Sequence, residues 1–180
     1  GKLYFFPLDA NSVLVVDPST NISDTTAISN VLFNVTLKWS GVVYDPTTGK
    51  LYFVPFNANS VLVVDPMTNV SDVTSVQASH GTEKWIGGVF VPSTGKMYFA
   101  AVNAAYVLVV DSSTNTSNTV DIRIELGASS KWSGVAFDPI TGILYFSPDN
   151  ANNVLVVTNQ SDTIVITNNI VGLRWRDVVH

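Results

Sequence analysis

A five-residue segment, Gly-Lys-Leu-Tyr-Phe or a close variant of it, returns at a nearly constant interval along this chain of 180 residues. Its four copies begin at Gly1, Gly49, Gly95 and Gly142. A second segment, Val-Leu-Val-Val, keeps the same interval and begins at Val13, Val61, Val107 and Val154. A fixed period of 46 to 48 residues is typical of proteins that stack one supersecondary unit several times, such as solenoids and propellers.

The second repeat shows what the unit contains. Runs rich in Val, Tyr and Phe are bounded by Asp-Pro, Thr-Gly and Asn clusters, which is the pattern of strands joined by turns. We expect strand a at Trp39–Tyr44, strand b at Lys50–Pro55, strand c at Val61–Val64 and strand d at Val70–Val76. No window shows a convincing apolar period of 3.6 residues, so the chain is expected to be essentially all β.

Three stretches of this repeat have a familiar form: Gly-Val-Val-Tyr-Asp-Pro-Thr-Thr-Gly-Lys-Leu-Tyr-Phe from Gly41, Asn-Ser-Val-Leu-Val-Val-Asp from Asn59, and Thr68-Asn69. Together they resemble the YVTN and NHL type of β-propeller repeat, and the resemblance covers all four repeats. It implies an all-β propeller of four four-stranded repeats, with strand a lining a central channel and strand d at the outer edge. It also implies that small residues of strand a face a narrow axis, namely Ser40-Gly41, Gly87-Gly88 and Ser133-Gly134.

No linker interrupts the repeats, so we expect a single domain over residues 1–180, with repeats at about 1–37, 38–83, 84–130 and 131–180 that are offset from the blades. The chain begins at a strand b, and Arg174–His180 matches a strand a. If this last strand pairs with Lys2–Phe6 of the same molecule, a four-bladed ring closes through a shared blade, and this is the preferred interpretation. If it pairs with a neighbouring chain, the same contact makes a head-to-tail polymer or a larger ring of two chains.

Composition narrows the classes of function. Charged residues make up 13% of the chain, and the net charge is −5 without a basic cluster, which argues against nucleic acid as a partner. No apolar stretch is long enough to cross a bilayer. There is no cysteine, so neither disulfides nor thiolate chemistry is possible. The surface rich in Asn, Ser and Thr favours an extracellular or cell-surface protein.

Residues that could carry catalysis are few. The two histidines, His80 and His180, occupy different positions in their repeats, and Glu83 and Glu125 are the two glutamates. Four of the twelve aspartates precede proline, where they favour turns, namely Asp17, Asp45, Asp65 and Asp138. No P-loop, HExxH or GxGxxG motif occurs. We therefore expect neither an enzyme nor a bound metal or cofactor.

Thr-Asn-x-Ser recurs in phase with the repeats and forms a sequon for N-glycosylation. The acceptors are Asn21, Asn69, Asn115 and Asn159, and a further sequon lies at Asn34. Two interpretations are open. The asparagines carry glycans in a secreted protein, or they serve the turn between strands c and d, because Asn tolerates the left-handed backbone conformation that such a turn needs.

A basic residue followed by tryptophan precedes strand a in each repeat and suggests a ligand face. The pairs are Lys38-Trp39, Lys84-Trp85, Lys131-Trp132 and Arg174-Trp175, and the loops between strands b and c add Asn59 and Asn152. Indole rings beside amides suit stacking against sugars, and the cations could hold a carboxylate or sulfate. The alternative is that each tryptophan packs between adjacent blades.

The function expected from these observations is that of a non-enzymatic structural or interaction module of a secreted or cell-surface glycoprotein. Its partners would be copies of itself, through terminal strand pairing, or other extracellular proteins. The alternative is a carbohydrate-binding lectin that uses the Trp, Asn and Lys face.

Overall fold

The computed structural model describes residues 1–29, 34–78, 81–121, 130–158 and 164–169. Within these ranges the chain forms strands, with no helix, and so contains no helix able to span a membrane. The strands form four antiparallel meanders, which confirms the expected all-β architecture of four repeated units.

Each meander is a sheet whose strands follow one another in sequence order. Sheet 1 consists of β1 (Leu3–Phe5), β2 (Leu14–Asp17) and β3 (Ile22–Asp24). Sheet 2 consists of β4 (Trp39–Tyr44), β5 (Leu51–Pro55), β6 (Leu62–Asp65) and β7 (Val70–Asp72). Sheet 3 consists of β8 (Trp85–Val91), β9 (Lys96–Ala101), β10 (Tyr106–Asp111) and β11 (Thr116–Asp121). Sheet 4 consists of β12 (Trp132–Asp138), β13 (Ile143–Pro148), β14 (Asn153–Thr158) and β15 (Ile164–Asn169).

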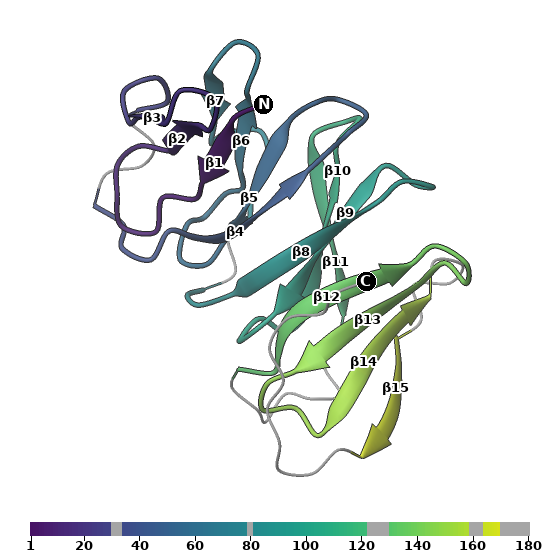
Figure 1. Cartoon of the computed structure of the whole chain (residues 1–180). Coiled ribbons are helices and arrows are strands. Elements are labelled where there is room, and N and C mark those ends of the chain that lie inside the picture. The colour runs from purple at the N-terminus through teal and green to yellow at the C-terminus, as the bar shows by residue number, and fades with distance from the viewer. Residues whose placement is uncertain (30–33, 79–80, 122–129, 159–163, 170–180) are drawn as a thin grey trace.

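The four sheets are arranged in an arc, with sheet 1 at one end and sheet 4 at the other (Figure 1). The first strands of sheets 2, 3 and 4 lie on the inside of this arc, where β8 packs against both β4 and β12. Within the described ranges β1 pairs only with β2, so sheet 1 has no strand a. The strand expected at Arg174–His180 lies outside these ranges, and closure of the ring stays a prediction.

The inside of the arc is crowded, as expected for a propeller axis. A Cβ atom added to Gly41 would lie 3.4 Å from the backbone nitrogen of Gly87. One added to Gly87 would lie 3.3 Å from the carbonyl oxygen of Ser133. Only small residues allow the three strands to approach so closely, because a side chain here would meet the backbone of the next sheet.

Two kinds of hairpin join the strands, and both use a left-handed residue. Glycine occupies this position between strands a and b, with φ of 71° at Gly49. Asparagine occupies it between strands c and d, with φ of 55° at Asn21, 58° at Asn69 and 51° at Asn115. Apart from Gly, Asn is among the few residues that adopt this conformation at low cost. These three asparagines therefore serve the turn between strands c and d, and glycosylation of the same residues stays a prediction.

Strand d of sheet 2 is shorter than expected. The sequence predicts Val70–Val76, whereas β7 ends at Asp72. The Asp72 carboxylate accepts hydrogen bonds from the backbone N–H of Thr74 (2.6 Å) and of Ser75 (3.2 Å), which bends the chain. Pairing resumes only where Val61 N–H donates to the Val76 carbonyl (2.9 Å). A side chain that competes for backbone donors explains the interruption.

The apolar core lies between neighbouring sheets and not inside any one of them. One cluster joins sheets 1 and 2 and includes Val15, Trp39 and Phe53. A second cluster joins sheets 2, 3 and 4 and includes Trp85 and Phe99. Each sheet is therefore stabilised by the sheets beside it.

Candidate functional site

The prediction of a ligand face is wrong for the three tryptophans that the structure describes. The side chains of Trp39, Trp85 and Trp132 are fully buried. Each indole Nε1–H donates to the backbone carbonyl of the residue directly before the Val-Leu-Val-Val segment, at Ser60 (3.0 Å), Tyr106 (2.8 Å) and Asn153 (3.1 Å) respectively. A buried indole with a hydrogen-bond partner is a structural anchor, and it has no free face for a sugar ring.

The lysines that precede these tryptophans are also buried. Lys38 Nζ donates to the carbonyls of Asp9 (2.9 Å) and Val35 (3.2 Å). Lys84 Nζ donates to the carbonyls of Ala58 (2.7 Å) and Gly81 (3.0 Å). Burial lowers the pKa of Lys38, with a smaller opposing effect of the Asp9 charge, and it lowers the pKa of Lys84 to about 8. These cations hold loop carbonyls and are withdrawn from any external anion.

The backbone of the same lysines joins one sheet to the next. The Lys84 N–H donates to the Phe56 carbonyl (3.0 Å), and the Lys131 N–H donates to the Val102 carbonyl (2.8 Å). The Lys38 N–H donates to the Leu8 carbonyl in the same way (2.7 Å). We call these three connections the Lys–Trp junctions. They explain why the pair recurs in every repeat.

Sequence reasoning missed a further part of each junction. The residue before the lysine has a positive φ, 52° at Leu37, 50° at Glu83 and 53° at Ser130. Its N–H donates 2.8 Å to a side-chain oxygen of the preceding sheet, that of Asp9, Asn57 or Asn103 in turn. The acceptor could have been found from the Asp or Asn that directly precedes the alanine in each loop between strands b and c. The donors could not, because Leu, Glu and Ser are not residue types that indicate a positive φ.

Of the other residues predicted for the ligand face, two are exposed and two lie outside the described ranges. Asn59 and Asn152 are exposed, whereas Arg174 and Trp175 lie outside the described ranges. The structure therefore does not bring together indole, amide and cation on one accessible surface among the residues that it describes.

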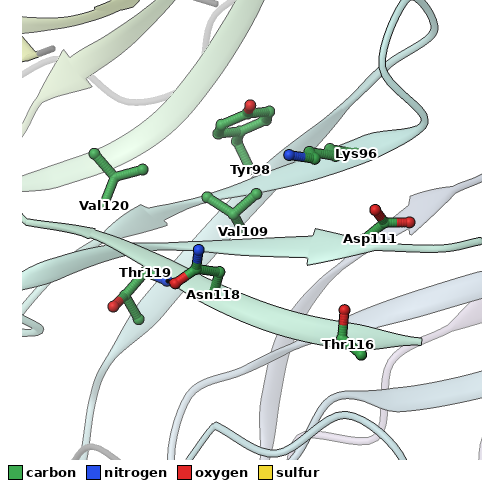
Figure 2. A pocket seen from close by; sticks show the side chains of 8 residues that line it. All are labelled: Lys96, Tyr98, Val109, Asp111, Thr116, Asn118, Thr119 and Val120. Atoms are coloured by element: carbon green, nitrogen blue, oxygen red, sulfur yellow. Dashed lines mark hydrogen bonds between the residues drawn. The ribbon is translucent and has the colours of Figure 1, made fainter. Parts of the chain in front are cut away.

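Two of the cavities in the described part of the chain involve sheet 3. One, of about 540 Å³, opens on the inside of the arc between sheets 2, 3 and 4, and its lining includes Ser40, Gly87, Ser133 and Asp149. The other, of about 450 Å³, lies on sheet 3 (Figure 2), lined by Lys96, Tyr98, Val109, Asp111, Thr116, Asn118, Thr119 and Val120. Tyr98 corresponds to Tyr52, whose hydroxyl donates to Asn115 of the next sheet (3.2 Å), so this face of a sheet is used for packing along the arc. No three His, Asp or Glu side chains gather to hold a metal ion in the described ranges.

Sheet 1 exposes apolar side chains whose counterparts are covered elsewhere. Leu3, Phe5, Phe6 and Leu8 are 52%, 47%, 41% and 38% exposed. We call these four residues the uncovered surface. Their counterparts in sheet 2 include Leu51, Phe53 and Val54, which are buried, and those in sheet 3 include Met97, Phe99 and Ala100, which are also buried.

Two features account for this difference. Leu51 and Phe53 pack against sheet 1 in the apolar cluster between sheets 1 and 2, whereas no described sheet packs on the corresponding face of sheet 1, and each of the other sheets also has a strand a. In sheet 3 the strand a residue Gly88 lies against Phe99, so closely that an added Cβ would be 2.4 Å from its ring. In sheet 2 the strand a residue Val42 pairs with Phe53. No described strand occupies this place beside β1.

Three sequons are accessible, and one is engaged. Asn21, Asn34 and Asn69 are exposed. Asn115 is partly buried because its side-chain oxygen accepts the Tyr52 hydroxyl. The fifth acceptor, Asn159, lies outside the described ranges.

Solved structures with the same arrangement are propellers of low sequence identity. Virginiamycin B lyase from Staphylococcus aureus, with quinupristin, is 14% identical with a TM-score of 0.69 over 93% of this chain and 52% of that one. The nidogen/laminin complex is 11% identical with a TM-score of 0.66, over 93% of this chain and 59% of that one. A nutrient binding protein from Bacteroides ovatus is 12% identical with a TM-score of 0.60, over 88% of this chain and 42% of that one.

These similarities define the fold. The chain has the fold of a β-propeller, and it spans about half the length of the solved structures that it matches. No protein-family model and no curated protein matches it. The matched propellers include a lyase as well as binding proteins, so they do not single out one type of propeller or one activity.

Proposed function

We propose that this chain is a non-enzymatic interaction module of a secreted or cell-surface glycoprotein, and that it assembles with copies of itself. The observation that carries this proposal is the uncovered surface on sheet 1. Propellers that appear in the nidogen/laminin complex and among nutrient binding proteins support a binding role for this fold.

The uncovered surface has the chemistry of a protein interface. Leu3 and Phe5 share one face of β1, and burying the exposed half of these two side chains contributes roughly 1.5 to 3 kcal/mol. Phe5 lies on β1, whose outer edge presents backbone donors and acceptors that a further strand can pair with. Apolar contact and strand pairing together favour a protein partner over a small polar ligand.

The accessible sequons support a secreted glycoprotein. Asn21 and Asn69 project from the hairpins between strands c and d, and Asn34 is exposed as well. Expression through a eukaryotic secretory pathway, followed by intact mass before and after enzymatic deglycosylation, tests this part. A loss of mass at these sites is expected. Unchanged mass contradicts the glycoprotein proposal and leaves the interaction surface to its own test.

Sedimentation velocity over a range of protein concentrations tests the assembly. We expect the wild-type chain to form larger species as its concentration rises. Phe5→Ser should raise the concentration at which half of the chain is assembled about tenfold, because the free energy of association weakens by roughly 1.4 kcal/mol. Ile140→Ser is the matched control, because Ile140 is 92% exposed in the hairpin between β12 and β13, far along the chain from β1. A monomer at every concentration, or equal effects of both substitutions, contradicts the proposal.

A further inference from the structure

We propose that the cavity on the inside of the arc binds a small organic cation, whose ammonium group pairs with the Asp149 carboxylate. This inference goes beyond the proposed interaction function and does not depend on it. The cavity has a volume of about 540 Å³ and lies beside β4, β8 and β12, whose places on the inside of the arc are seen in Figure 1. Its volume is within the range of sites that hold small molecules.

Asp149 occupies a position that is apolar in the other three repeats. The backbone N–H of Phe56, Val102 and Asp149 donates to the carbonyl of the junction lysine of its own sheet, at 2.8 Å, 2.9 Å and 2.8 Å respectively. The three residues are therefore structural counterparts. Leu8 is the counterpart in sheet 1, because its carbonyl accepts the N–H of the next junction lysine as the carbonyls of Phe56 and Val102 do. Sheet 4 thus places a carboxylate where each other sheet places an apolar side chain.

The carboxylate stands where a charge is costly. Asp149 is 8% exposed. Burial of a carboxylate costs free energy that burial of an apolar side chain does not. Leu8, Phe56 and Val102 show that the position accepts apolar residues in the same backbone arrangement. A buried residue that departs from the rule of its own repeat in this way is expected at a functional site.

The other lining residues suit an amphiphilic cation. Among the described residues that line the cavity, Asp149 alone is charged. An ammonium group donates hydrogen bonds to a carboxylate and to hydroxyl oxygens, and its alkyl chain gains free energy when it leaves water for an apolar wall. The lining offers both, with hydroxyls from Ser40, Ser130 and Ser133 and apolar side chains from Val42, Phe56, Ile86 and Val102.

The charge of the cavity favours an organic cation over a metal ion or an anion. A calcium ion takes several oxygen ligands, in which carboxylates offset its charge. No three His, Asp or Glu side chains gather for such a role in the part of the chain that the structure describes. An anion would meet the Asp149 carboxylate and, among the described lining residues, no cationic side chain. The net charge of −5 also attracts cations to the chain.

Isothermal titration calorimetry with hexylammonium chloride tests the site. Hexylammonium carries an ammonium group on an apolar chain, whereas 1-hexanol and hexanoate keep the chain and remove or invert the charge. We expect saturable binding of one hexylammonium ion per chain, and binding of the other two probes that is weaker by at least about tenfold. Calcium chloride is titrated in parallel. Equal binding of the three organic probes, no saturable binding of hexylammonium, or calcium binding that hexylammonium fails to displace overturns the inference.

Variants assign the binding to Asp149. Asp149→Asn keeps the shape of the side chain and removes its charge, so it should weaken hexylammonium binding about tenfold. Asp65→Asn is the matched control, because it removes a charge at the end of β6, outside the lining of the cavity, and it should leave binding unchanged. An equal loss of affinity in both variants, or none in Asp149→Asn, overturns the inference.

Asp149→Leu separates binding from a structural role of the carboxylate. This substitution gives sheet 4 the residue that sheet 1 has at the same position. We expect the variant to unfold at the same or a higher temperature, because an apolar side chain replaces a buried carboxylate, and to lose hexylammonium binding. A lower unfolding temperature would show that the carboxylate serves the fold, and it would overturn the inference, as would binding that persists in this variant.

Discussion

At the scale of single residues, the lysines of the Lys–Trp junctions show how a charged group serves a buried connection. Lys84 is fully buried, and its ammonium group lies 5.8 Å from the centre of the Trp85 ring while it donates to two loop carbonyls. Burial disfavours the charged form, which is why the pKa falls. The hydrogen bonds to carbonyls keep the group useful in either protonation state, because the neutral amine can still donate.

The pKa of Lys84 predicts a pH dependence of stability. Its value of about 8 in the folded chain lies below the ordinary 10.5, so the unfolded chain binds more protons between these two pH values. The free energy of unfolding should therefore rise from about pH 8 to pH 10.5, by on the order of 2 kcal/mol. Urea titrations at a series of pH values measure this rise. In Lys84→Met most of the rise should disappear, and the remainder comes from Lys38, whose pKa is also lowered. Lys50→Met should keep the full rise, and a rise of equal size in Lys84→Met contradicts the assignment.

Asn115 should differ from the other asparagines of the same phase. Asn115→Gly keeps the left-handed turn and removes the acceptor of the Tyr52 hydroxyl. We expect a loss of about 1 kcal/mol in the free energy of unfolding. Asn69→Gly, at an exposed turn with nearly the same φ, should cost less than about half of that. Tyr52→Phe should add little to Asn115→Gly if the hydrogen bond is the cause, and additive losses would show that it is not.

At the scale of elements, the hairpins show what could be predicted and why. Asp-Pro, Thr-Gly and Thr-Asn marked both turns of the second repeat, because left-handed positions accept few residue types. The end of strand d was harder to place, since Asp72 can act as a strand residue or as a turn-forming acceptor. In sheet 3 the corresponding residue is Asn118, and β11 continues to Asp121. The choice depends on local hydrogen bonds that composition does not reveal.

Two glycines of these elements should respond differently to the same substitution. Gly49→Ala, in a turn with φ of 71° and no atom near the added carbon, should cost about 1 kcal/mol from backbone strain alone. Gly88→Ala should cost about 3 kcal/mol, because the added carbon would lie 2.4 Å from the Phe99 ring and 2.8 Å from Val43. Thermal unfolding measures both. Gly49→Asn should restore most of the loss at the turn, and a full loss there would contradict the conformational explanation.

At the scale of the whole molecule, the period of the repeats predicted the four sheets. Whether the tryptophans form a ligand face could not be predicted, because it depends on how neighbouring sheets pack against one another. Tryptophan in every repeat was compatible with a ligand face or with packing, and Trp39 and Trp85 show packing. Each indole is held in the core by a carbonyl 21 residues further along the chain, at Ser60 for Trp39 and at Tyr106 for Trp85. The left-handed Glu83 could not be foreseen, because the contact with Asn57 of the preceding sheet imposes that conformation on an ordinary residue.

The placement of the core between sheets has a consequence for how the molecule loses its structure. Because neighbouring sheets stabilise one another, cooperativity passes from each sheet to the next, as in a linear chain of coupled units. A sheet in the middle has two such neighbours, and sheet 1 has one. Among the described sheets, sheet 4 likewise has one neighbour, so opening should begin at sheets 1 and 4 and travel toward the middle. A partner strand bound at β1 would then slow the unfolding of residues that it never touches.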